Sequence, residues 1–274
     1  MYSRRTFLKI SGVLDSLLAG GYIFRNSSFT KVKHILSSAS HEKLAVSLSL
    51  SKGVENLDLI LNNKILVAGR SIDREGKHWQ FISDKLLSDT SYELELSSEK
   101  ESIFKPWQLK TFPDPESEVK NISMMAFTCA GGGDGFKASG KEFFKSFKFR
   151  QKIFDEGLSK NPDFAISIGD HIYFDLRGEN FPPVGRNSKL IKFFVGGYLK
   201  FRYGVFNRSE SADSENNETI LKKIGNEQIA ALYGTKFKST PIFFIPDDHD
   251  YFENDDAEED LVTFPADAFS KDAF

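Results

Sequence analysis

Three groups of metal-binding side chains follow apolar stretches in the second half of the chain. The stretches are ISMMAFT (residues 122–128), FAISIG (164–169) and PIFFIP (241–246); the side chains that follow them are Cys129, then Asp170 and Tyr173, then Asp247, Asp248 and His249. A thiol, a phenol, an imidazole and carboxylates can all bind metal ions. The Asp170 carboxylate could bridge two cations, which lie about 3.5–4 Å apart in two-metal sites. The pattern therefore predicts a metal site.

The residue types narrow the choice of metal. A phenol has an unperturbed pKa near 10, so only a strongly Lewis-acidic ion such as ferric iron would bind Tyr173 as a phenolate. A Cys129 thiolate likewise indicates a transition metal. The His249 imidazole could hold a phosphoryl oxygen or protonate a leaving group.

Each of these residues also has a purely structural interpretation. Cys129 could be a small buried apolar residue, and Tyr173 could lie at the edge of a core. The run DDHD (247–250) could be a solvated loop. The sequence has no G-x-S-x-G elbow and no Walker glycine loop, which argues against serine hydrolases and nucleoside triphosphatases.

Alternating strands and helices are expected to position these side chains. From residue 121 onward, the three apolar stretches read as strands. Between them lie two segments with helical spacing, GKEFFKSFKFRQKIFDEGLSKN (140–161) and ETILKKIGNEQIAALYG (218–234). Such α/β sheets place their sites at the carboxyl ends of the strands, which is where all three polar groups stand.

The preceding segment, residues 41–113, reads as a small fibronectin-like β-sandwich. Its strand candidates are KLAVSLSL (43–50), LDLILNN (57–63), HWQFIS (78–83) and SYELELSS (91–98). A tyrosine opens the last of them after LLSDTS, as in late strands of fibronectin-type domains. The stretch WQLKTFPDPESEV (107–119), with two prolines and a charge cluster, indicates a linker.

Residues 1–40 read as an export signal and linker. SRRTFLK (3–9) followed by a moderately apolar stretch matches the twin-arginine signal. Asp15 and several glycines interrupt that stretch, which argues against the alternative of a membrane anchor. We expect cleavage near residues 37–40, recognition by the twin-arginine export machinery, membrane contact only during export, and a periplasmic or extracellular location.

Composition excludes some classes of protein. The chain has 274 residues and a net charge of -3, which carries no nucleic-acid-binding signature. It has one cysteine, so no internal disulfide can form, and its 27 phenylalanines could fill a large core.

Taken together, the motifs resemble those of a known family. GDHIYFD (169–175) and IPDDHDYFEN (245–254) resemble the G-D-x-I-Y and D-D-H-E blocks of the alkaline phosphatase D family, metallophosphoesterases related to purple acid phosphatases. The FTCAGG strand end (127–132), the β-sandwich and the twin-arginine signal occur in that family in the same order. The resemblance covers essentially the whole chain.

The resemblance implies an exported enzyme that hydrolyses phosphate mono- or diesters with a metal-activated hydroxide. Cys129, Asp170 and Tyr173 would bind Fe³⁺. Asp248, with Asp247, would bind a second ion, Ca²⁺ or another divalent metal. His249 would contact the substrate phosphate, and His249 and Asp170 would be the catalytic residues.

Two features depart from the family pattern. Asp250 stands where glutamate is commoner, and the sequence ends 25 residues after His249 (274 − 249), without the family's later G-D-x-H-like block. The expected fold over 121–274 is therefore an α/β (α+β) metallophosphoesterase-like sandwich, incomplete at its C-terminus, with an exposed apolar face. The alternative function is that of an inactive truncated remnant, at most an exported binding module.

Overall fold

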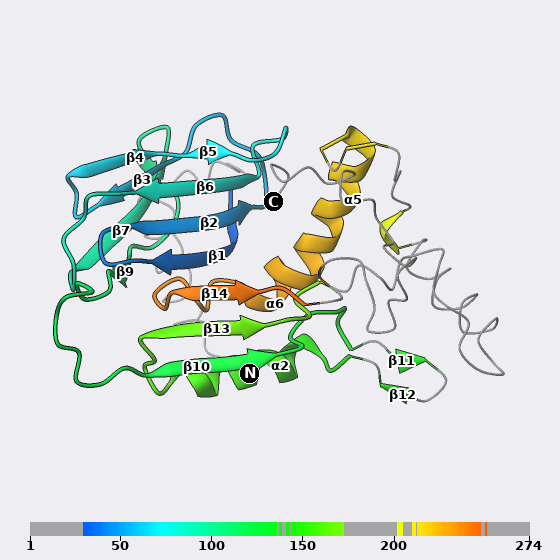
Figure 1. The fold of residues 1–274 in the computed structure, drawn as a ribbon. Helices are drawn as coiled ribbons and strands as arrows, with labels where there is room; N and C mark the ends of the chain where they lie inside the picture. Colours follow the sequence, from blue (N-terminus) through cyan, green and yellow to red (C-terminus); the bar gives the residue numbers. More distant parts are fainter. Residues whose placement is uncertain are drawn as a thin grey trace, which may run out of the picture.

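The computed structural model describes residues 30–135, 137–138, 141–142, 144–172, 202–204, 210–211, 213–247 and 250 (Figure 1). These residues form a β-sandwich followed by an α/β unit, in the expected order. No helix in these ranges has the length and apolar character needed to cross a membrane.

The sandwich consists of two antiparallel sheets. One has the order β1-β2-β6-β5, and in the other β4, β3, β7 and β8 are neighbours, with β9 also paired to β7. The strands are β1 (Val32–Ala39), β2 (Leu44–Leu50), β3 (Asp58–Leu61), β4 (Ile65–Ala68), β5 (Arg70–Ser71), β6 (His78–Ser83), β7 (Ser91–Ser98), β8 (Glu101–Ser102) and β9 (Trp107–Lys110).

Alternating side chains from both sheets fill one core. Val46 and Phe81 project from the first sheet and Leu59 and Leu94 from the second, and all four are buried. Each such side chain stabilises the fold by about 1.5–3 kcal/mol through burial. At the start of β7, the Leu87 N–H donates to the Tyr92 hydroxyl at 2.9 Å, the tyrosine-corner bond typical of immunoglobulin-like sandwiches.

The sandwich is longer at both ends than the sequence indicated. β1 lies before the expected boundary at residue 41, and its Ile35 is fully buried in the core. Cleavage near residues 37–40 would remove most of this strand. At the other end, β9 lies inside the stretch read as a linker, because Trp107 and Leu109 alternate with polar residues and turn into the core.

The α/β unit is built on a parallel sheet of order β10-β13-β14. Its strands are β10 (Met124–Thr128), β13 (Phe164–Ile168) and β14 (Ile242–Ile245); a short hairpin, β11 (Lys137–Ala138) and β12 (Lys141–Glu142), follows β10. The helices are α2 (Phe147–Leu158), α5 (Glu215–Gly225), the π-helical η3 (Asn226–Ala230) and α6 (Ala231–Tyr233). The first helix begins later than residue 140 because Ser146 caps it, its hydroxyl accepting from the Phe149 N–H.

The two faces of the parallel sheet differ in their surroundings. On one face, Phe127 of β10 packs against Phe154 of α2 and against Tyr233 and Phe237. On the other face, Met124, Ile168 and Ile245 are 53%, 43% and 50% exposed. Part of the apolar face expected from the sequence is thus exposed.

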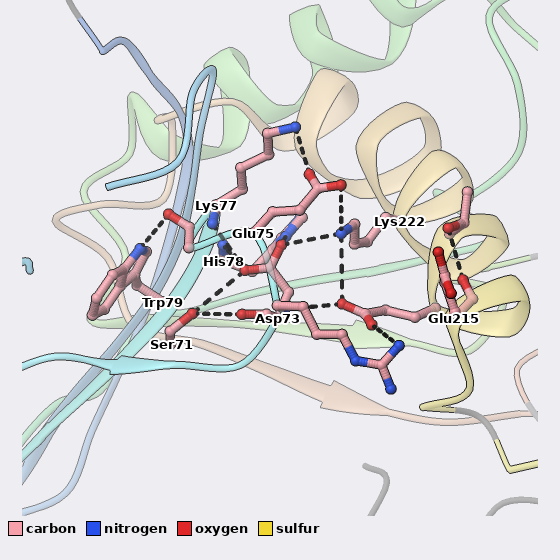
Figure 2. Close-up of polar contacts among 12 residues, drawn as sticks. Ser71, Asp73, Glu75, Lys77, His78, Trp79, Glu215 and Lys222 are labelled. Atoms are coloured by element: carbon pink, nitrogen blue, oxygen red, sulfur yellow. Dashed lines mark hydrogen bonds and ion pairs between the residues drawn. The ribbon is translucent and has the colours of Figure 1, made fainter. Parts of the chain in front are cut away.

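Ionic contacts attach the sandwich to α5 (Figure 2). Lys222 Nζ lies 3.4 Å from Asp73 Oδ2, 3.3 Å from Glu75 Oε1 and 3.5 Å from Glu218 Oε1. Burial alone would lower the pKa of Lys222, but these carboxylates outweigh it and raise that pKa. The Ile35 N–H of β1 also donates to Gly234 O at 3.0 Å, so β1 and the end of α6 are joined directly.

Candidate metal centre

The carboxyl ends of the three parallel strands lie level with one another. Thr128 pairs with Ile168, and Ile168 pairs with Ile245, so the next residues of all three strands emerge at one edge of the sheet. Cys129 follows β10 directly, while Asp170 and Asp247 each follow their strand by two residues. Neighbouring strands are only about 4.8 Å apart, so this register places the three residues along one edge of the sheet.

Close backbone contacts fix these strand ends. The Gly169 N–H donates to Ile245 O at 2.7 Å, and the Gly131 N–H donates to Asp170 O at 2.8 Å. A Cβ on Gly169 would lie 2.5 Å from Asp247 Cβ, and one on Gly131 would lie 2.4 Å from Asp170 O. Only glycine therefore allows the three strand ends to approach so closely.

Two residues at this edge have left-handed backbone conformations. Cys129 has φ +53° and Asp170 has φ +55°, although neither is a glycine. Such conformations cost free energy for residues with a Cβ, and they occur often at functional sites. Both therefore stand out from the regular strands that precede them.

The Cys129 thiol lies in a field of negative charge. Its hydrogen bond with Thr128, at 3.3 Å between Oγ1 and Sγ, is the largest influence on its pKa and lowers it. Burial, a hydrogen bond with Asp170 and the charges of Asp170 and Asp247 outweigh that bond and raise the pKa of Cys129. A bound cation would relieve this crowding of charge. Cys129 is exposed, so it is not the buried apolar residue that we considered as the alternative.

Asp250 connects the second and third strand ends. Its Oδ1 accepts from the N–H groups of His171 and Ile172, both at 2.8 Å, and its Oδ2 accepts from the Asp247 N–H at 3.2 Å. Asp247 and Asp250 are thus tied to the loop after β13 and do not simply belong to a solvated loop.

His171 is buried at this edge and has a structural role. Its Nε2 donates to Ile245 O at 3.0 Å, because a carbonyl can only accept, and its Nδ1 lies 3.1 Å from Ser167 Oγ. Ser167 Oγ lies 3.3 Å from the Tyr233 hydroxyl, so the imidazole is held within a buried polar network.

The residues that hold the glycine loop after Cys129 were not predicted from the sequence. The Gly132 N–H donates to the buried Gln228 Oε1 at 3.1 Å, and Arg150 binds the loop carbonyls. Gln228 is presented by η3, and π-helical turns are frequent at functional sites. These residues lie 21 and 99 positions beyond Cys129 in the sequence, so only the fold reveals their association with it (150 − 129 and 228 − 129).

The remaining predicted ligands lie outside the described residues. Tyr173, Asp248 and His249 belong to this group, while Cys129, Asp170 and Asp247 are described. Within the described ranges, no three histidine, cysteine, aspartate or glutamate side chains are arranged so that they could hold a metal ion by themselves. The thiol and two carboxylates fit a metal centre in chemical type, and further ligands would have to complete it.

Comparisons with known proteins identify the fold. No protein-family profile matches the chain, and no curated protein matches it in sequence. The solved structure of PhoD superposes with a TM-score of 0.51 at 12% identity, over 83% of this chain and 40% of that chain. The purple acid phosphatase PPD1 from yellow lupin (Lupinus luteus) seeds gives a TM-score of 0.41 at 12% identity, over 81% of this chain and 35% of its own. The chain therefore shares the fold of the matched part of PhoD, and it spans less than half the length of PhoD.

Proposed function

We propose that this chain belongs to an exported, metal-dependent phosphoesterase that hydrolyses phosphate mono- or diesters. One observation carries the proposal: in a PhoD-like fold, three parallel strands end in register and bring Cys129, Asp170 and Asp247 to one edge of the sheet. The twin-arginine motif supports export to the periplasm or the extracellular space.

Each residue would have a defined task at this centre. Cys129, Asp170 and Tyr173 would hold Fe³⁺, and Asp247 and Asp248 would hold Ca²⁺ or another divalent ion. Such ions supply charge neutralisation on phosphate oxygens and activation of water. His249 would orient the phosphate or donate a proton to the leaving oxygen. Asp250 would keep the two acidic loops together through its three backbone hydrogen bonds.

Metal analysis combined with a chromogenic phosphate-ester assay tests this proposal. We expect the purified protein to contain iron and to lose hydrolysis when a chelator removes its metal. Asp170→Asn and Cys129→Ser should each lower metal affinity by more than the roughly tenfold to hundredfold that loss of an outer-shell partner costs, because each replaces a direct ligand. Asp84→Asn, at an exposed carboxylate of the sandwich, is the control and should change neither quantity.

A spectroscopic measurement tests the ferric iron separately. If Tyr173 binds Fe³⁺ as a phenolate, the protein should show a visible charge-transfer band that Tyr173→Phe abolishes, because phenylalanine keeps the ring and lacks the oxygen. A colourless wild-type protein with full activity would remove Tyr173 and ferric iron from the mechanism.

The second candidate is a non-catalytic exported binding module. It is favoured by the lack of a self-sufficient metal cluster among the described side chains. If the wild-type chain retains no metal and has no esterase activity under any metal supplementation, this alternative replaces the enzyme.

A further inference from the structure

Four consecutive carbonyl groups of the loop after β10 converge on one buried guanidinium. Arg150, on α2, is only 8% exposed. Its Nη1 donates to Ala130 O at 2.6 Å and also to Gly131 O, and its Nη2 donates to Gly133 O at 2.7 Å. Both nitrogens lie 3.3 Å from Gly132 O. The loop 130–133 therefore curls around a single side chain.

Arginine suits this arrangement because its guanidinium is planar and rigid. It presents five N–H donors in a fixed fork, whereas lysine presents three donors on one mobile nitrogen. The guanidinium also lies over the Phe147 ring, 4.9 Å from its centroid, which fixes its plane from the side of the helix.

The N–H groups of the same loop are held from other directions. The Gly131 N–H donates to Asp170 O at 2.8 Å, and the Gly132 N–H donates to Gln228 Oε1 at 3.1 Å. Cys129 stands at the start of this loop in its left-handed conformation. The direction of the Cys129 side chain is thus set by a loop whose carbonyls and amides are both bound.

We propose that Arg150 is the positioning residue of the Cys129 loop. It binds the carbonyls of residues 130–133 and thereby keeps the thiol beside the Asp170 carboxylate at the edge of the sheet. This inference deepens the proposed metal centre and rests on it for its functional meaning. All the contacts that support this inference are between residues of the protein, so none of them depends on a bound metal.

Amide hydrogen exchange separates this role from a general contribution to stability. In Arg150→Met, we expect exchange of the amides in the loop 130–133 to accelerate by about tenfold or more, because the loop opens locally. Amides of β2 and β7 should keep their exchange rates. Arg150→Lys should give an intermediate loop rate, and Lys152→Met, an exposed change on the same helix, should leave it unaltered. Unchanged loop exchange, or equal acceleration throughout the protein, would overturn the proposal.

Cobalt(II) binding provides the functional readout. Cys129 is the only cysteine in the sequence, so thiolate-to-cobalt absorption reports this residue alone. We expect Arg150→Met to weaken cobalt binding by about tenfold, in line with other outer-shell positioning groups. Equal cobalt affinity and equal absorption in Arg150→Met and wild type would overturn the positioning role. If Arg150→Met does not fold, the same comparisons made with Arg150→Lys decide the question.

The two measurements also distinguish this inference from the proposed function. If wild-type protein shows no thiolate-to-cobalt band, the metal centre is contradicted, and hydrogen exchange still decides whether Arg150 holds the loop. If cobalt binds at Cys129 and loop exchange does not respond to Arg150, the metal centre stands and the positioning role is rejected.

Discussion

His34 lies in the sandwich with its Nδ1 2.6 Å from Ser49 Oγ. Burial is the main reason that its pKa falls from 6.5 to about 4, and the nearby His78 lowers it further. In the unfolded chain the imidazole titrates near 6.5, so between pH 6.5 and about 4 the unfolded state binds a proton that the folded state does not bind. His34 therefore destabilises the protein progressively as the pH falls through this range.

We expect this residue to remove about 2 kcal/mol of folding free energy between pH 7.5 and pH 5, given about 1.4 kcal/mol per pKa unit. Urea unfolding at the two pH values measures the loss. In His34→Gln, the decrease in folding free energy between pH 7.5 and pH 5 should be about 2 kcal/mol smaller than in the wild type, whatever the absolute stability of the variant. His41→Gln, at a histidine with an exposed side chain in the same domain, should show the same pH-dependent loss of folding free energy as the wild type. An unchanged pH dependence in His34→Gln would show that another group titrates.

At the level of single residues, the candidate ligands could be predicted from the sequence, whereas the residues that hold the loop beside them could not. Cys129, Asp170 and Asp247 could be singled out because each lies within two residues of the end of an apolar strand and has a side chain of a type that can bind metals. Arg150 and Gln228 lie within helical segments, where a polar residue ordinarily faces solvent. Their burial depends on how those helices lie against the sheet, which residue types alone do not specify.

The strand ends themselves depend on glycine. Gly169 has φ +66°, and a Cβ there would meet Asp247 Cβ at 2.5 Å. We expect Gly169→Ala to cost about 2 kcal/mol, because it adds both backbone strain and overlap in a packed position. It should also push the ends of β13 and β14 apart and weaken metal binding.

Gly225, the last residue of α5, is the matched control. A Cβ there meets nothing within 4 Å, and its φ of −59° is helical. Gly225→Ala should stabilise the protein by about 0.5–1 kcal/mol, because alanine loses less backbone entropy in a helix. Thermal and urea unfolding of both variants measure the two effects. Equal behaviour of the two alanine variants would contradict the close approach of the strand ends.

The longest and most regular elements were the most predictable. The expected strands at 78–83 and 91–98 coincide with β6 and β7, because their side chains alternate between core and solvent over six or more residues. β5 and β8 have two residues each, too few to show any alternation. β1 was not predicted, because its segment was interpreted as the end of the export signal and its linker. The π-helical turn η3 was not predicted, because such a turn has no hydrophobic periodicity that distinguishes it in the sequence.

On the scale of the whole molecule, several contacts join the sandwich to the α/β unit. They include the ionic group around Lys222, the backbone contact between β1 and Gly234, and a hydrogen bond from Ser37 Oγ to Lys238 O. α5 continues through η3 into α6, so the segment that meets the sandwich also carries Gln228 to the glycine loop. The sandwich thus supports the segment that helps to position the candidate site.

Among the described residues, helices lie against one face of the parallel sheet, where Phe127 packs on Phe154 of α2. Phe112 from the end of the sandwich reaches the other face, where it contacts Phe164 and Phe243 at the start of the strands. Farther along the strands, Ile168 and Ile245 remain exposed beside each other. Contiguous exposed apolar side chains on a sheet favour self-association.

We therefore expect the wild-type chain to bind the dye ANS at this face and to associate at high concentration. The double variant Ile168→Thr/Ile245→Thr keeps β-branched residues in both strands and removes apolar surface. It should reduce dye binding and association while changing the free energy of unfolding by less than about 1 kcal/mol, because the side chains are half exposed.

Ile82→Thr, at an outward position of β6 that is 59% exposed, serves as the control and should alter neither property. Dye fluorescence and light scattering provide the measurements. If Ile82→Thr lowers both signals as much as the double variant does, association arises from general surface hydrophobicity and not from Ile168 and Ile245 of the parallel sheet.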